Sequence, residues 1–160
     1  MNALKEIQKL LKENDIQYRE FHHKPVRTSQ EADDVRPDFT MQQGAKAIII
    51  KARIGKGKKF VMLVLPGDKR IDSKKTKKML NCKSFSFASE DEVIEITNGV
   101  IPGGVPPFGN LFDLPVYIDP TLSENETIIF NAGDRSVSIA MKYRDYERIV
   151  EHQIPDFIEN

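Results

Sequence analysis

Residues 99–109 read Gly-Val-Ile-Pro-Gly-Gly-Val-Pro-Pro-Phe-Gly, and seven of these eleven residues are Gly or Pro. Pro fixes φ and removes a backbone N–H, whereas Gly reaches φ > 0 and lets the backbone approach a ligand closely. The segment therefore cannot form a regular helix or a central strand, and we expect a stiff loop. Two interpretations are open: a rigid surface turn, or a loop whose spare backbone amides face a bound group.

The rest of the composition is that of an ordinary soluble domain. With 160 residues, 39% of them hydrophobic, the chain is long enough to bury a core without disulfides or metals, and we expect one domain over residues 1–160. It has no apolar run of about 18 residues, which argues against a membrane span. The first six residues lack a signal-peptide pattern, and the single Cys82 cannot form an internal disulfide. These features predict a cytoplasmic protein.

Charge is distributed unevenly along a chain whose net charge is zero. Residues 46–83 hold thirteen Lys or Arg against two Asp, a local net charge of +11, whereas residues 84–160 carry a net charge of −10. A basic block on ordered elements is a candidate surface for phosphate groups, and its alternative is a solvated lysine-rich face. The acidic remainder would confine any contact with nucleic acid to this block.

The first third of the chain predicts two helices separated by a strand. Apolar residues at positions 3, 4, 7, 10 and 11 follow helical spacing and predict an amphipathic helix that ends near residue 14. We expect a short strand over residues 16–21. Thr28 and Glu31 fit a capping box, which predicts a helix over residues 29–35.

The remaining chain predicts mainly strands. Apolar runs over residues 45–52 and 59–65 indicate a hairpin whose strands are covered on both faces. Ser73 and Ser89 are predicted to cap two further helices. Because the strands outnumber the helices and pair mostly with neighbours, we predict an α+β fold with an antiparallel or mixed sheet. The last expected elements are strands over residues 116–118, 127–130 and 136–141 and a closing helix over residues 143–152.

Lys46 is the first candidate for chemistry, because it opens the apolar run over residues 45–52. An ammonium group at the mouth of a buried strand costs free energy unless it reaches water or meets an anion. Lys46 is therefore either a lysine at the rim of a sheet or the binding residue for an anionic ligand.

The Gly/Pro loop carries a resemblance to a known family. Residues 103–109 are similar to the G-x-x-x-P loop of the YbaK and prolyl-tRNA-synthetase-associated editing domains. Four further features fall in the family's order, and the similarity runs over residues 3–155: Thr28 to Ala32 after His23-Lys24-Pro25, Lys46 before an apolar run, the turn over residues 131–135, and a closing helix. The resemblance implies a curled, barrel-like sheet, mixed or mostly antiparallel, with helices packed around it.

The resemblance also implies an enzyme, an aminoacyl-tRNA deacylase that hydrolyses the ester of mischarged tRNA. Lys46 would bind the 3′ end of the tRNA. An ester is already activated, so stabilising the oxyanion matters more than a strong nucleophile. The expected oxyanion donors are the amides of Gly103, Gly104 and Val105, held in place by Pro106 and Pro107. The loop over residues 103–107 as a whole is expected to form one wall of the amino-acid pocket. Further candidates for the pocket are Phe21, Thr28, Asn131, Gly133 and Ser138.

No metal or organic cofactor is expected, because three histidines stand without a cluster of Cys or carboxylates. The expected partner is the acceptor end of aminoacyl-tRNA, with prolyl-tRNA synthetase as a further candidate. Cys- or Ala-tRNA(Pro) is the implied substrate, by a substrate-assisted or a water-mediated mechanism. Phe21 and Ser138 stand where cysteinyl-tRNA deacylases carry a tyrosine and an acidic residue, which weakens a transfer of cysteine specificity.

Two alternatives remain open at this point. One is a non-catalytic tRNA-binding or accessory module of the same fold, which the departure at Ser138 favours. The other is a hydrolase or binder of small amino-acid esters that uses the same loop, against which the basic block over residues 46–83 argues.

Overall fold

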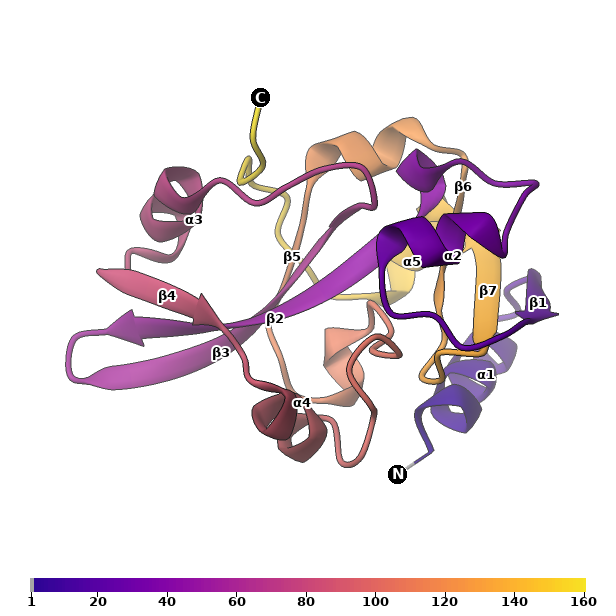
Figure 1. The fold of residues 1–160 in the computed structure, drawn as a ribbon, viewed down its shortest axis with the longest axis horizontal. Coiled ribbons are helices and arrows are strands. Elements are labelled where there is room, and N and C mark those ends of the chain that lie inside the picture. The colour runs from indigo at the N-terminus through magenta and orange to yellow at the C-terminus, as the bar shows by residue number, and fades with distance from the viewer. Residues whose placement is uncertain (1) are drawn as a thin grey trace.

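The computed structural model describes residues 2–160, and its strands form two sheets (Figure 1). A three-stranded antiparallel sheet has the order β1-β7-β6, and a four-stranded sheet has the order β4-β2-β3-β5. In the second sheet β3 and β5 run parallel, whereas the other neighbours run antiparallel. The strands are β1 (Tyr18–His22), β2 (Ala45–Ile54), β3 (Gly57–Pro66), β4 (Ser84–Phe87), β5 (Val116–Ile118), β6 (Thr127–Asn131) and β7 (Val137–Lys142).

Five short helices and three 3-10 turns connect these strands. The helices are α1 (Ala3–Glu13), α2 (Ser29–Asp34), α3 (Ser73–Leu80), α4 (Glu90–Ile96) and α5 (Tyr143–Ile149), and the 3-10 turns are η1 (Met41–Gln43), η2 (Gly109–Leu111) and η3 (Pro120–Glu124). Over residues 2–160, every helix is too short or too polar to cross a membrane.

The predicted α+β class and the mixed pairing are confirmed, but the shape of the sheet is not. The sheets meet at an isolated bridge between Gly44 and Ile129, next to the start of β2, and they do not close into a barrel. The expected barrel-like curvature is therefore unconfirmed. That residues 1–160 form one domain stays a prediction.

Several local predictions need correction. Asp72, not Ser73, caps α3, because its side chain accepts from the Lys75 amide. The closing helix ends at Ile149, earlier than expected. Strand β4 was not predicted: its Ser-Phe-Ser-Phe sequence does alternate with period two, but it is only four residues long. The predicted cap at Ser89 is confirmed, and together with Glu92 it forms a capping box.

The hairpin of β2 and β3 lies between two hydrophobic clusters. Met62 and Val64 of β3 belong to the cluster that contains Phe108, whereas Leu63 and Leu65 belong to the other. Successive side chains of a strand point to opposite faces, so an uninterrupted apolar run is what a strand buried on both faces requires. The predicted coverage of both faces is thus confirmed for the second half of β3.

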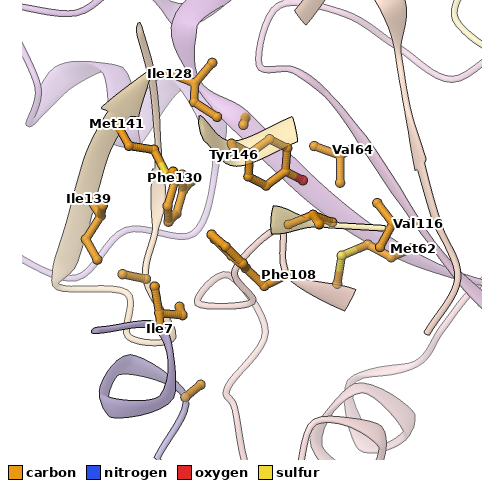
Figure 2. Packing of buried hydrophobic residues seen from close by; sticks show 14 of the residues in the cluster. Ile7, Met62, Val64, Phe108, Val116, Ile128, Phe130, Ile139, Met141 and Tyr146 are labelled. Carbon is orange, nitrogen blue, oxygen red and sulfur yellow. The ribbon is translucent and has the colours of Figure 1, made fainter. Parts of the chain in front are cut away.

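The Gly/Pro loop is fixed to the larger of these clusters (Figure 2). Phe108 is fully buried and packs edge-on against Phe130 and Tyr146, with ring centroids 5.3 and 5.4 Å apart. The buried Tyr146 hydroxyl donates to the Pro107 carbonyl oxygen at 2.6 Å. Burial raises the pKa of Tyr146 well above its ordinary value, so the hydroxyl remains a donor. Helix α5 therefore holds the loop from the far end of the chain.

A Tyr146→Phe substitution should lower the free energy of unfolding by about 1–3 kcal/mol, because it leaves the buried Pro107 carbonyl without a donor. Chemical denaturation measures the change. Tyr117→Phe is the matched control, since Tyr117 is also buried and the structure gives its hydroxyl no hydrogen bond within residues 2–160. Equal losses in the two variants would contradict the role given to the Tyr146 hydroxyl.

Candidate active site

A cavity of about 330 Å³ lies where β2 of one sheet meets β6 of the other. Strand β4 pairs only with β2 residues Ile50 to Arg53, so the first half of β2 is left to line the cavity. The other walls come from α2, η1, the loop over residues 102–105 and the end of β6. In Figure 1, α2 lies across this junction.

Lys46 lines the cavity from the start of β2. Its Nζ donates to the Lys69 carbonyl oxygen at 2.7 Å and lies 3.5 Å from that of Gly67. Burial, and then the charge of Arg70, lower the pKa of Lys46, and Asp68 opposes this. An ammonium group carries three N–H donors, so at least one is left for a ligand. The side chain is thus a positioned cation and not a lysine that simply reaches water.

Arg36 is a second cation at this cavity, and it was not among the predicted residues. Its Nε donates to the Ala32 carbonyl oxygen at 3.1 Å. Burial lowers the pKa of Arg36 to about 10, against the charge of Asp33, so the guanidinium stays protonated at neutral pH. Arg36 follows a six-residue helix and belongs to no periodic pattern, which is why no sequence signal marked it. A fixed guanidinium and an ammonium suit a phosphate or another anion.

Ser138 does not line the cavity but positions Arg36. It is fully buried in β7, and its Oγ lies 2.7 Å from His23 Nε2 and 3.4 Å from Arg36 Nη1. His23 Nδ1 lies 2.8 Å from the Lys24 carbonyl oxygen, which can only accept. Nδ1 therefore carries a proton; in the neutral imidazole Nε2 accepts from the Ser138 hydroxyl, whose oxygen accepts from Arg36. The Ser138 hydroxyl thus connects His23 to the Arg36 guanidinium and helps to hold it in place.

Phe21 lies beside Ser138, its partner in the register of β1 and β7. Its ring packs edge-on against Phe39 at 5.6 Å, and the Arg19 guanidinium lies over both rings. Phe39 lines the cavity, whereas Phe21 does not. The two departures from the family pattern, Phe21 and Ser138, therefore lie together behind the cavity wall.

The Gly/Pro loop contributes only part of what was predicted. Gly103 and Val105 line the cavity, and within residues 2–160 the structure shows no acceptor for their amides. The prediction that the Gly104 amide is an oxyanion donor is wrong. Its N–H already donates to the Ile101 carbonyl oxygen at 2.9 Å, so this amide is not free. Asn131 Nδ2 donates to the Gly103 oxygen at 2.5 Å, while Asn131 Oδ1 is buried without a partner in the described chain.

The remaining predicted residues support this arrangement from different places. Thr28 lines the cavity and caps α2, its Oγ1 accepting from the Glu31 amide at 3.0 Å. Pro106 and Pro107 are buried and do not line the cavity, so only Gly103 and Val105 contribute to the wall that was expected from residues 103–107. Gly133 also stays outside the cavity, and its N–H donates to the Gly104 oxygen at 2.9 Å.

Of the eleven predicted site residues, five line the cavity and six do not. Around the cavity are Lys46, Thr28, Gly103, Val105 and Asn131. The cavity is thus lined by two fixed cations, two residues whose amides have no acceptor in residues 2–160, and an unpartnered amide oxygen. In residues 2–160, no three His, Cys, Asp or Glu side chains gather in a way that could hold a metal ion.

Comparison with known proteins identifies the class. The chain belongs to the aminoacyl-tRNA editing domain family, which matches residues 23–149. This match confirms the resemblance carried by the Gly/Pro loop, and with it an enzyme class, the hydrolases that act on the aminoacyl ester of tRNA.

Particular relatives are named for different amino acids. The multifunctional Ser/Thr-tRNA deacylase ProXp-y of Escherichia coli K12 is 30% identical over 149 residues, which cover 92% of this chain and 88% of that protein. The prolyl-tRNA editing protein ProX of Acetoanaerobium sticklandii is 28% identical, covering 94% of this chain and 92% of that protein. A crystal structure described as a candidate trans-editing enzyme for prolyl tRNA synthetase has a TM-score of 0.81 at 21% identity, covering 100% and 99% of the two chains; it shares the fold.

Gly133→Ala should destabilise the fold by about 1–3 kcal/mol, because Gly133 has φ +90° and a Cβ there would lie 2.8 Å from Ala3 Cβ. Gly55→Ala is the matched control: Gly55 also has a positive φ, +58°, but a Cβ there would meet nothing within 4 Å. Thermal unfolding of the two variants separates strain in the backbone from the collision with α1. A Gly133 variant no less stable than the Gly55 variant would be inconsistent with this contact.

Proposed function

We propose that the protein is a free-standing aminoacyl-tRNA deacylase that hydrolyses the ester of mischarged tRNA, with tRNA(Pro) as the substrate tRNA. The observation that carries the proposal is that one cavity is lined both by two cations, Lys46 and Arg36, and by two loop residues, Gly103 and Val105, whose amides have no acceptor in residues 2–160. In this arrangement the 3′-terminal nucleotide lies against the cations, and the ester carbonyl lies against the loop.

Hydrolysis of the ester requires the protein to position the substrate and to stabilise the charge that develops on the carbonyl oxygen. When water or a substrate group attacks the ester, negative charge develops on the carbonyl oxygen, and fixed N–H donors stabilise it without reorganising. The amides of Gly103 and Val105 are available for this, because the loop around them is anchored by other groups. The Asn131 Oδ1 atom is an acceptor suited to the α-ammonium group of the amino acid.

The removed amino acid is a small one. At about 330 Å³ the cavity lies near the lower limit of ligand pockets, which span about 300–1,000 Å³. Its apolar lining includes Ala47, Ile49 and Val105, which favours a short side chain. Cysteine and alanine are the candidates that the family resemblance implies, and serine and threonine are those named for the Escherichia coli relative.

A non-catalytic tRNA-binding module remains the second candidate, since the cations would serve binding alone equally well. The feature that favoured it was Ser138 in place of an acidic residue. Ser138 lies outside the cavity wall and holds Arg36, so its identity does not remove a group from the reacting centre.

The deciding experiment measures release of amino acid from tRNA(Pro) charged separately with cysteine, alanine, serine, threonine and proline. Selective release of one or more of the four non-cognate amino acids above the spontaneous rate is expected, with prolyl-tRNA(Pro) spared. Salt-sensitive binding of tRNA(Pro) without release from any of the five would instead support the non-catalytic module.

Lys46→Ala should lower kcat/KM for the preferred substrate about ten- to a hundredfold, the range expected for loss of one hydrogen bond to a charged group. Lys51→Ala is the matched control: Lys51 lies on the same strand, outside the cavity, and pairs with Glu92 at 3.0 Å. Single-turnover kinetics and thermal unfolding are measured on both variants. If the Lys46 variant unfolds, or loses no more activity than the Lys51 variant, the binding role of Lys46 fails.

A further inference from the structure

A second hollow of about 310 Å³ lies next to the candidate active site, between α3 and β4. We call it the α3–β4 groove; its lining residues are Ser73, Lys77, Ser84, Phe85, Ser86 and Phe87. Phe87 also lines the active-site cavity, so the two hollows share one side chain. Figure 1 shows α3 and β4 at the same end of the β2–β3 ribbon.

Phe87 is unusual for its exposure. Its side chain is 62% exposed, more than any other exposed large hydrophobic residue in the described chain. It stands at the end of an edge strand, opposite Ile50 in register, where no element covers it. Single exposed apolar residues are common and need no function. An exposed aromatic ring between two hollows lined by lysines calls for a specific explanation.

Of two lysines of α3, Lys75 and Lys77, only the first is held in an ion pair within the described chain. Lys75 of α3 is occupied, because its Nζ lies 3.2 Å from Asp156 and donates to the Ile158 oxygen at 3.0 Å. Lys77, which lines the groove, has no acidic partner within residues 2–160. Ser84 and Ser86 add exposed hydroxyl groups. An aromatic face, an unpaired ammonium and hydroxyl donors together form the usual recognition set for single-stranded nucleic acid.

We propose that the α3–β4 groove binds the single-stranded nucleotides that precede the 3′-terminal nucleotide of tRNA, with Phe87 stacked on a base and Lys77 on a phosphate. This proposal rests on the proposed function, which assigns the terminal nucleotide to the cavity. Lys46 and Ile50 lie on the same face of β2, four residues or about 13 Å apart. Phe87, opposite Ile50, is thus placed to meet a nucleotide upstream of the one held at Lys46.

The first test compares two substrates that differ only upstream of the terminal nucleotide: aminoacyl-tRNA(Pro) and aminoacyl-adenosine carrying the same amino acid. Phe87→Ala should raise KM for the tRNA about fivefold to a hundredfold, the range for one lost base–aromatic stack, with a much smaller change for aminoacyl-adenosine. Phe87→Trp should retain the wild-type KM. Ile154→Ala, which truncates an exposed apolar side chain in the C-terminal segment, is the control. Equal changes for both substrates, or no change for the tRNA, would overturn the proposal.

The second test does not depend on hydrolysis, so it separates failure of the groove from failure of the proposed function. Fluorescence anisotropy measures binding of a short single-stranded RNA with the 3′ sequence of tRNA(Pro). Phe87→Ala should weaken this binding at all salt concentrations, and Lys77→Gln should reduce the slope of log K against log salt by about 1. Wild-type binding that neither substitution alters would refute the groove, even if the enzyme hydrolyses aminoacyl-tRNA.

Discussion

The hydrogen bond from Tyr146 to the Pro107 carbonyl is the contact on which the candidate site depends. A loop rich in Gly and Pro has few donors of its own, and a buried carbonyl needs a partner. The partner comes from α5, near the end of the chain, and Phe108 fills the core between them. On its other side the loop is held by Asn131. Because both ends are anchored, the amides of the loop keep a fixed direction, which is what electrostatic preorganisation requires.

The basic block over residues 46–83 divides into structural and available charges, a distinction that its sequence does not reveal. Lys51 pairs with Glu92, whose pKa falls to about 2 because it accepts from the Ser89 amide and then from Lys51. Lys75 ties α3 to the C-terminal segment, and Lys46 holds the Lys69 carbonyl. That the block contacts phosphates stays a prediction, and so does its alternative, a solvated lysine-rich face.

The sequence predicted the candidate-site residues that belong to a recognisable local pattern. It did not predict the residues whose place depends on contacts with residues distant in the chain. Lys46 could be found because it interrupts an apolar strand, and Gly103 and Val105 because the Gly/Pro loop stands out. Arg36 could not be found, since its place depends on Ser138, a hundred and two residues away along the chain. Strand β4 was not predicted because four residues are too few for a strand periodicity to be recognised. Gly104 was misassigned because sequence cannot tell which amides of a loop are already bonded.

The two departures from the family pattern, Phe21 and Ser138, occupy related positions in the structure. Phe21 and Ser138 are register partners on β1 and β7, and each supports a different residue of the cavity wall: Phe21 packs on Phe39, and Ser138 holds Arg36. Neither side chain lines the cavity, so exchanging either would act by moving the ring or the guanidinium in front of it. Under the proposed function, the shape and charge placement of the wall would then set substrate choice. A comparison of specificity among relatives should therefore follow these pairs of residues rather than single positions.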